Sequence, residues 1–183
     1  MAERRTRADA LNNRARIVRA ARELLTPGAE LPMNAVAKAA GVGQGTLYRN
    51  FPTREALLAE VYRADVDQLV SSAAPLLERH DAATALRRWL SDVADYARVK
   101  RGVLAALEPA SGHELAASAT GTIGEAIDRL LDAGKAEGTV RADVDSQDVL
   151  TLLGFLSRMD EAEAAERAEH LLELIVSGVL ARS

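Results

Sequence analysis

One short stretch of the chain, residues 44–50, gathers side chains that can contact nucleic acid. Gln44 can pair bidentately with adenine, and Thr46 can offer a hydroxyl or a methyl group to a base edge. Tyr48 and Arg49 can reach phosphates, which fix the register of a protein on DNA without reading its sequence. These residue types in this order predict a surface that binds double-stranded DNA.

The flanking pattern predicts two short helices that would hold these side chains rigidly. One spans residues 32–40 and ends at Gly41, because the left-handed position after a helix favours glycine. The next spans residues 44–50, where Gly45 lacks a side chain and lets backbone approach DNA closely. Two short helices joined by a tight turn form the helix-turn-helix pattern, whose second helix enters the major groove.

A preceding helix over residues 13–26 completes a small three-helix head. Its apolar residues share one stripe, and four arginines (Arg14, Arg16, Arg19 and Arg22) occupy its other faces. Residues 1–12 form an expected flexible basic arm. This arm either reaches a minor groove or serves only as a solubilising tail.

At this point the sequence resembles the TetR family of bacterial transcriptional regulators, specifically over about residues 13–62. The matching residues are Ile17 to Leu25, Val36-Ala37, Ala40-Gly41-Val42, Gly45-Thr46-Leu47-Tyr48, Phe51, Arg54 and Leu57. The resemblance implies a homodimer that represses transcription and leaves a pseudo-palindromic operator when a small molecule binds. Three positions depart from the family pattern: Gly43 replaces a common Ser, Asn50 a common His, and Pro32 a usual Thr or Ser.

The resemblance also assigns the DNA contacts residue by residue. Base or near-base contacts are Gln44, Gly45 and Thr46, and phosphate contacts are Tyr48, Arg49, Asn50 and Arg54.

The charge distribution supports a polyanion contact confined to this head. The whole chain has a net charge of −4, but residues 1–54 carry +6 and residues 55–183 carry −10. An acidic body repels DNA and leaves the basic head as the docking surface.

The rest of the chain predicts an all-α protein of about nine helices. Alanine and leucine together make up a third of the residues, whereas only six residues are aromatic. Residues 13–53 are the expected DNA-binding domain, and residues 54–183 are the expected helical ligand-binding and dimerisation domain. The fourth helix is expected over residues 54–72, with Pro75 as a break or a kink near its end, and a separate short apolar piece is expected over 103–107.

Six residues on the central helices are candidates for lining a ligand cavity, although each fits an ordinary core equally well. They are Tyr62, Trp89, Val93, Tyr96, Leu104 and His113. Such a lining favours a mostly apolar ligand with one or two polar groups.

The last two helices are more apolar than one covered face requires, which indicates a dimer interface rather than a fully internal hairpin. The expected interface residues are Leu153, Leu156, Ala168, Leu171, Ile175 and Val179.

Other functions find little support in the sequence. Cysteine is absent, no apolar run is long enough to span a membrane, and no catalytic motif is present, so we expect a cytoplasmic, non-enzymatic protein without cofactor or metal. The main alternative is a helical small-molecule-binding protein that no longer reads DNA, and a helical enzyme is a third.

Overall fold

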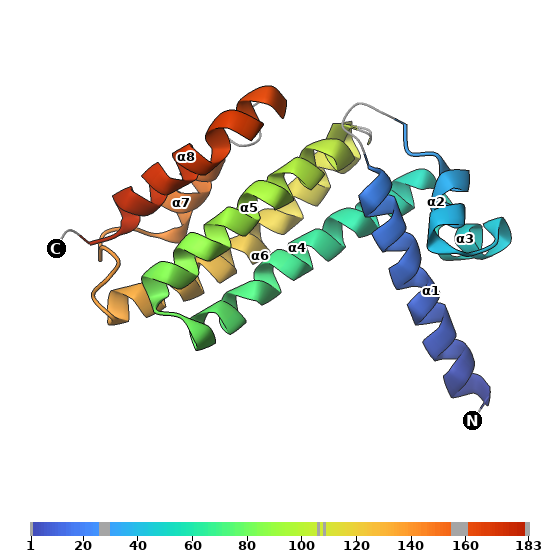
Figure 1. Ribbon diagram of the computed structural model, residues 1–183, viewed down its shortest axis with the longest axis horizontal. Helices are drawn as coiled ribbons and strands as arrows, with labels where there is room; N and C mark the ends of the chain where they lie inside the picture. The colour runs from blue at the N-terminus through green and yellow to red at the C-terminus, as the bar shows by residue number, and fades with distance from the viewer. Residues whose placement is uncertain (1, 26–29, 106, 108, 155–160, 182–183) are drawn as a thin grey trace. The chain divides into compact units, whose positions relative to one another are not determined.

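The computed structural model describes residues 2–25, 30–105, 107, 109–154 and 161–181, and in these residues the protein is all-α with eight helices (Figure 1). The chain divides into two compact units. One contains Met1–Ala64 and Val99–Leu115, and the other contains Asp65–Arg98 and Ala116–Ser183. The first unit therefore includes residues well outside the 13–53 domain expected from the sequence.

The first unit contains helices α1 (Ala2–Leu24), α2 (Met33–Ala40), α3 (Gln44–Asn50) and the beginning of α4 (Arg54–Arg79). Helix α3 has the bounds that the sequence predicted. Helix α1 begins much earlier than residue 13, so the residues expected to form an arm continue the helix. These residues contain no glycine or proline and several good helix formers, which favours such an extension.

Apolar side chains from all four helices form the core of this unit. The buried residues are Ile17, Ala20, Ala21, Leu31, Val36, Ala37, Ala40, Leu47, Phe51, Leu57, Leu58, Val61 and Tyr62. The core contains Ile17, Ala20 and Ala21 of the apolar stripe expected on the first helix, whereas Leu24 of that stripe is 38% exposed.

Helix α4 does not break at Pro75, contrary to the expectation of a helix ending near residue 72. It continues to Arg79 with the proline inside it. A proline removes one backbone N–H, and a helix held by tertiary contacts can absorb that loss. One such contact lies in the turn before it, where the buried Trp89 donates its indole Nε1–H to the carbonyl oxygen of Leu69 at 2.9 Å.

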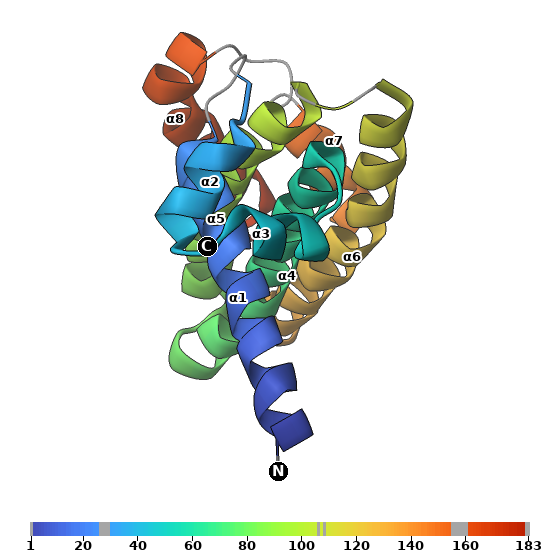
Figure 2. The same cartoon turned by 90° about the vertical axis from the view of Figure 1, so that its right-hand side faces the viewer.

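The second unit contains most of α5 (Ala82–Ala105) and α6 (Pro109–Ala136), with α7 (Ser146–Leu153) and α8 (Glu161–Val179). Within this unit α4, α5 and α6 lie side by side in both views (Figures 1 and 2). The apolar piece expected separately at residues 103–107 belongs to α5 as far as Ala105, so the described chain has eight helices instead of nine.

Side-chain caps begin several of the helices. The Thr53 hydroxyl accepts from the Ala56 N–H at 3.1 Å, and the Asp81 carboxylate accepts from the Thr84 N–H at 2.9 Å. At α7, Asp145 and Asp148 form a reciprocal capping box that the sequence analysis did not predict.

A short backbone clasp holds the end of α8 against the α6–α7 connection. Val140 and Leu180 form an isolated antiparallel bridge, and the Arg141 N–H donates to the Val179 carbonyl at 3.1 Å. Gly134 permits this approach, because a Cβ there would lie 2.3 Å from Val140 Cγ2. No helix in the described part of the chain is long and apolar enough to cross a membrane.

Candidate nucleic-acid interface

The turn between α2 and α3 is built around Gly41, as the sequence predicts. Gly41 has a φ of 63°, a left-handed conformation that L side chains rarely adopt. Its N–H donates to the Lys38 carbonyl at 3.1 Å, and the Val42 N–H donates to the Ala37 carbonyl at 3.0 Å. These bonds satisfy the last carbonyls of α2 and fix where α3 begins.

Helix α3 starts without a side-chain cap and is held by one buried residue. Gly43 occupies the N-cap position in extended backbone, and no side chain accepts from the first N–H groups. Leu47 is the buried residue of α3 and packs it onto the head. The N–H groups of Thr46 and Leu47 donate to the Gly43 carbonyl at 2.9 and 3.1 Å, so backbone bonds alone form the start of the helix.

The structure places the expected base contacts at the start of α3. Gln44 and Gly45 are exposed, whereas Thr46 is half-buried. A Cβ built on Gly45 meets nothing within 4 Å, so no neighbour inside the chain requires glycine there. This open space fits a role for Gly45 in admitting a surface from outside the chain.

The expected phosphate contacts on α3 differ in how they are held. Tyr48 is 46% exposed, whereas Asn50 is half-buried and donates from Nδ2 to the Thr46 carbonyl at 2.8 Å. Arg49 lies along its own helix, where Nε donates to the Gly45 carbonyl at 3.0 Å and Nη2 to the Thr46 hydroxyl at 3.1 Å. Tyr48 and Arg49 are thus presented at the surface, and the amide of Asn50 is occupied by its own helix.

Arg54, the seventh expected DNA contact, begins α4 in an acidic environment. Its guanidinium lies 3.7 Å from a Glu30 carboxylate oxygen and 3.5 Å from one of Glu55. The pKa of the Glu55 carboxyl lies below its ordinary value, mainly because the backbone N–H of Glu55 donates a hydrogen bond to it. Thr53 and Arg54 lower this pKa further. A phosphate must therefore compete with carboxylates for Arg54.

Two arginines of α1 that sequence reasoning left on outer faces bind the ends of the two helix-turn-helix helices. Arg16 donates to the carbonyls of Ala40, the last residue of α2, and of Gly41, the latter at 3.0 Å. Arg14 donates from Nη1 to the carbonyl of Asn50, the last residue of α3, at 3.2 Å. The sequence contains a signal for these contacts, because arginines are favourable near helix C-termini. The sequence does not show which helix end each arginine reaches.

The six residues expected to line a ligand cavity do not share one environment. Trp89, Val93 and Tyr96 are buried on α5 in the second unit, whereas Tyr62 is buried in the first unit. Leu104 is half-buried, and His113 is exposed on α6. The indole N–H of Trp89 is already bonded to Leu69, as an ordinary core residue would be.

Most of the residues expected at the dimer interface have little exposed surface in the single chain. Leu153, Ala168, Ile175 and Val179 are buried within the chain itself, Leu171 is half-buried, and Leu156 lies outside the described residues. The exposed large apolar residues of α7 and α8 are instead Leu152, at 50%, and Leu174, at 55%. Three residues of the expected set, Leu171, Ile175 and Val179, also line a groove between α7 and α8, so the expected interface stays a prediction.

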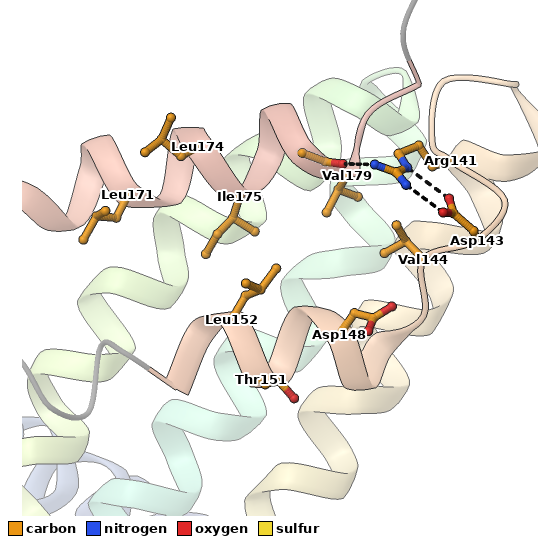
Figure 3. Close-up of a pocket in the computed structure, with 11 residues that line it drawn as sticks. Arg141, Asp143, Val144, Asp148, Thr151, Leu152, Leu171, Leu174, Ile175 and Val179 are labelled. Carbon is orange, nitrogen blue, oxygen red and sulfur yellow. Dashed lines mark hydrogen bonds and ion pairs between the residues drawn. The ribbon is translucent and has the colours of Figure 1, made fainter.

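An open groove of about 830 Å³ lies between helices α7 and α8 (Figure 3). Leu152 of α7 and Ile175 of α8 point toward each other across it. At one end, Arg141 and Asp143 form an ion pair of 2.6 Å that raises the pKa of the arginine and lowers the pKa of the carboxyl through their hydrogen bonds. The remaining lining residues are Val144, Asp148, Thr151, Leu171, Leu174, Gly178 and Val179.

Two family models match the chain, one for each functional region. The model of bacterial regulatory proteins of the tetR family matches residues 17–61. The model of the transcriptional regulator SbtR-like C-terminal domain matches residues 81–181, more than half of the chain. The chain belongs to the TetR family of DNA-binding transcriptional regulators. This family consists of regulators rather than enzymes, as we expected for this chain.

Several solved structures share the fold over nearly the whole chain. The TetR regulator SCO0520 from Streptomyces coelicolor has a TM-score of 0.81 and 35% identity, covering 93% of this chain and 99% of its own. A TetR regulatory protein from Mycobacterium vanbaalenii has a TM-score of 0.78 and 32% identity, covering 96% and 99%. The TetR family regulator PfmR from Thermus thermophilus has a TM-score of 0.58 and 25% identity, covering 88% and 94%. No match is found among curated proteins.

Proposed function

We propose that this protein is a homodimeric repressor that binds a pseudo-palindromic operator through α3 and leaves it when a small molecule binds. The exposed outer face of α3 carries this proposal. Gln44 and Gly45 lie at its start with open space around Gly45, and Tyr48 and Arg49 follow one turn later. The N-terminal residues of such a helix are the ones that reach base edges in a major groove.

Each side chain of this face has a distinct role in the proposal. Gln44 reads a base edge, and Thr46 offers its hydroxyl or methyl group nearby. Gly45 allows the backbone to come close to the DNA. Tyr48 and Arg49 bind phosphates on either side, and Asn50 supports α3 through its bond to the Thr46 carbonyl more than it contacts DNA.

Arg54 contributes a weaker phosphate contact in this proposal. It lies at the N-terminus of α4, where the helix dipole favours an anion. Because its guanidinium is already close to Glu30 and Glu55, part of the attraction to phosphate is offset by losing those ion pairs.

The α7–α8 groove is the proposed contact between two copies of the chain. Leu152 and Leu174 are half exposed on the two helices, and Leu171 lies beside them in the groove. Exposed leucines of this size on adjacent helices favour burial against a partner. A twofold arrangement brings two helices from each copy into a four-helix bundle, with the buried Leu153, Ala168, Ile175 and Val179 supporting it from beneath.

The proposed effector is a mostly apolar small molecule sensed by the second unit. Trp89, Val93 and Tyr96 of α5 are the aromatic and apolar candidates of that unit. An effector releases DNA only to the extent that it binds the DNA-free conformation more tightly.

The DNA-binding half of the proposal is tested by selecting bound sequences from a random pool with the purified protein. The selected motif should be pseudo-palindromic, and a gel-shift titration should give saturable binding that resists non-specific competitor. Absence of competitor-resistant binding to any selected sequence contradicts the proposal.

The effector half is tested with the fluorescence of Trp89, the chain's single tryptophan. Candidate apolar ligands that release operator DNA should also shift or quench its buried emission. Release of DNA by a ligand that leaves this emission unchanged contradicts a site near Trp89.

A further inference from the structure

The guanidinium of Arg14 has several partners within the first unit, although its side chain is 39% exposed. Its Nε and Nη2 lie 3.2 and 3.1 Å from Oε1 of Glu60 on α4, and its Nη1 donates to the Asn50 carbonyl at 3.2 Å. The flat face of the group lies over the Phe51 ring, with 4.4 Å to the ring centroid. Arg14 thus joins three helices, α1, α3 and α4, at a single point.

The contact between Arg14 and Asn50 lies at the C-terminal end of α3. The last carbonyls of a helix have no partner within it, and the helix dipole makes this end favourable for a cation. Asn50 is the last residue of α3, and Phe51 directly after it is buried at 1% exposure. Because α3 is only seven residues long and lacks a side-chain cap at its start, its position depends strongly on how this end is held.

We propose that Arg14, held by Glu60, is a positioning residue for DNA recognition that fixes the C-terminal end of α3 and does not bind DNA. The inference rests on the proposed DNA-reading role of α3. Arg14 would otherwise count among the basic residues of the head that attract phosphate. Its Nε and Nη2 pair with Glu60, which also lies 3.4 Å from Nη1 of Arg63, and its Nη1 donates to the Asn50 carbonyl. Each of its three nitrogens therefore has a partner within the first unit.

The two roles predict opposite effects when Glu60 is removed. If Arg14 bound a phosphate, Glu60→Ala would free its guanidinium and remove a negative charge, so DNA binding would tighten. If Arg14 positions α3, Glu60→Ala loosens the guanidinium at the end of the helix, so binding weakens although the head becomes more positive. The sign of the change therefore separates the roles.

The experiment measures operator affinity at several salt concentrations for the full-length wild type and four variants, with thermal unfolding of each. Arg14→Gln should weaken binding about tenfold, and Arg14→Lys should not restore it although the charge is kept. The salt dependence of both should match the wild type, because the number of neutralised phosphates is unchanged. Arg19→Gln is the matched control: Arg19 is exposed on the same helix, makes no hydrogen bond or ion pair among the described residues, and should change affinity less than about twofold.

Three outcomes overturn the inference: tighter binding by Glu60→Ala, a flatter salt dependence in Arg14→Gln, or equal losses in Arg14→Gln and Arg19→Gln. If Arg14→Gln does not fold, Arg14→Lys and Glu60→Ala still decide it. A wild type without competitor-resistant binding contradicts the proposed function instead. Normal wild-type binding with an unaffected, folded Arg14→Gln contradicts only the positioning role.

Discussion

Helix α3 and the α7–α8 groove are both exposed, but their chemistry suits different partners. The outer face of α3 is polar, and Arg49 and Asn50 are ordered by hydrogen bonds to their own helix. The groove is largely apolar and leaves Leu152 and Leu174 half exposed. The first surface suits a polar partner such as DNA, whereas the proposed second copy would cover apolar surface that water solvates poorly.

The largest effect should come from placing a charge in the groove. Leu174→Glu should make the protein monomeric and weaken operator binding about a hundredfold or more, because the second half-site no longer adds avidity. Sedimentation velocity and gel-shift titration measure the two effects. Ser177→Glu, which adds the same charge at an exposed position of α8 outside the groove, should remain dimeric. A dimeric Leu174→Glu variant contradicts the assignment of the groove.

The next effect concerns the phosphate contacts of the polar face. Arg49→Ala should weaken binding to all sequences alike and reduce the slope of log affinity against log salt by about one. Arg54→Ala should do the same to a smaller extent, because that guanidinium already lies close to Glu30 and Glu55. A larger loss from Arg54→Ala would show that its acidic neighbours do not restrain it.

A smaller change separates DNA contact from folding at Gly45. Gly45→Ala should weaken DNA binding yet raise stability by about 0.5–1 kcal/mol, since its Cβ meets nothing in the chain and alanine is the better helix former. Gel shifts and thermal unfolding measure the two quantities. Gly43→Ser serves as the control, because it adds an N-cap hydroxyl and should be slightly more stable with DNA binding retained. Unchanged affinity in Gly45→Ala means that the backbone there does not approach DNA.

The smallest effect concerns the second unit alone, where Asp81 caps α5. The hydrogen bond from the Thr84 N–H lowers the pKa of this carboxyl. Its stabilisation should therefore be complete above the ordinary Asp pKa of about 3.9 and be lost as pH falls through the lowered folded value. Asp81→Ala should reduce the thermal midpoint at pH 7, and the difference from wild type should shrink below about pH 4. A difference that persists in acid contradicts the role of the ionised cap.

Helices α3 and α4 differ in how far the sequence predicts them. The bounds of α3, its buried Leu47 and the left-handed Gly41 follow from neighbouring residues, and the structure confirms them. The end of α4 was predicted wrongly, because Pro75 lies in a helix that tertiary contacts hold together. Local propensity decides the bounds of α3, whereas long-range packing decides where α4 ends.

Contacts between distant residues account for most of what the sequence leaves open. Arg14 and Arg16 read as exposed charges on α1, and only the fold brings them to the ends of α3 and α2. The charge count for residues 1–54 likewise omits Glu60, which pairs with Arg14 from outside that range. On α8, periodicity finds an apolar stripe but does not show that Ile175 and Val179 are largely buried by the chain itself while Leu174 stays exposed in the same groove.

Whether α3 reads bases through Gln44 is decided by comparing the DNA sequences selected by the wild type and by Gln44→Ala. We predict that the variant keeps the spacing of the two half-sites and loses its preference at one base position in each. The same selected motif bound with uniformly lower affinity would contradict a base-reading role for Gln44.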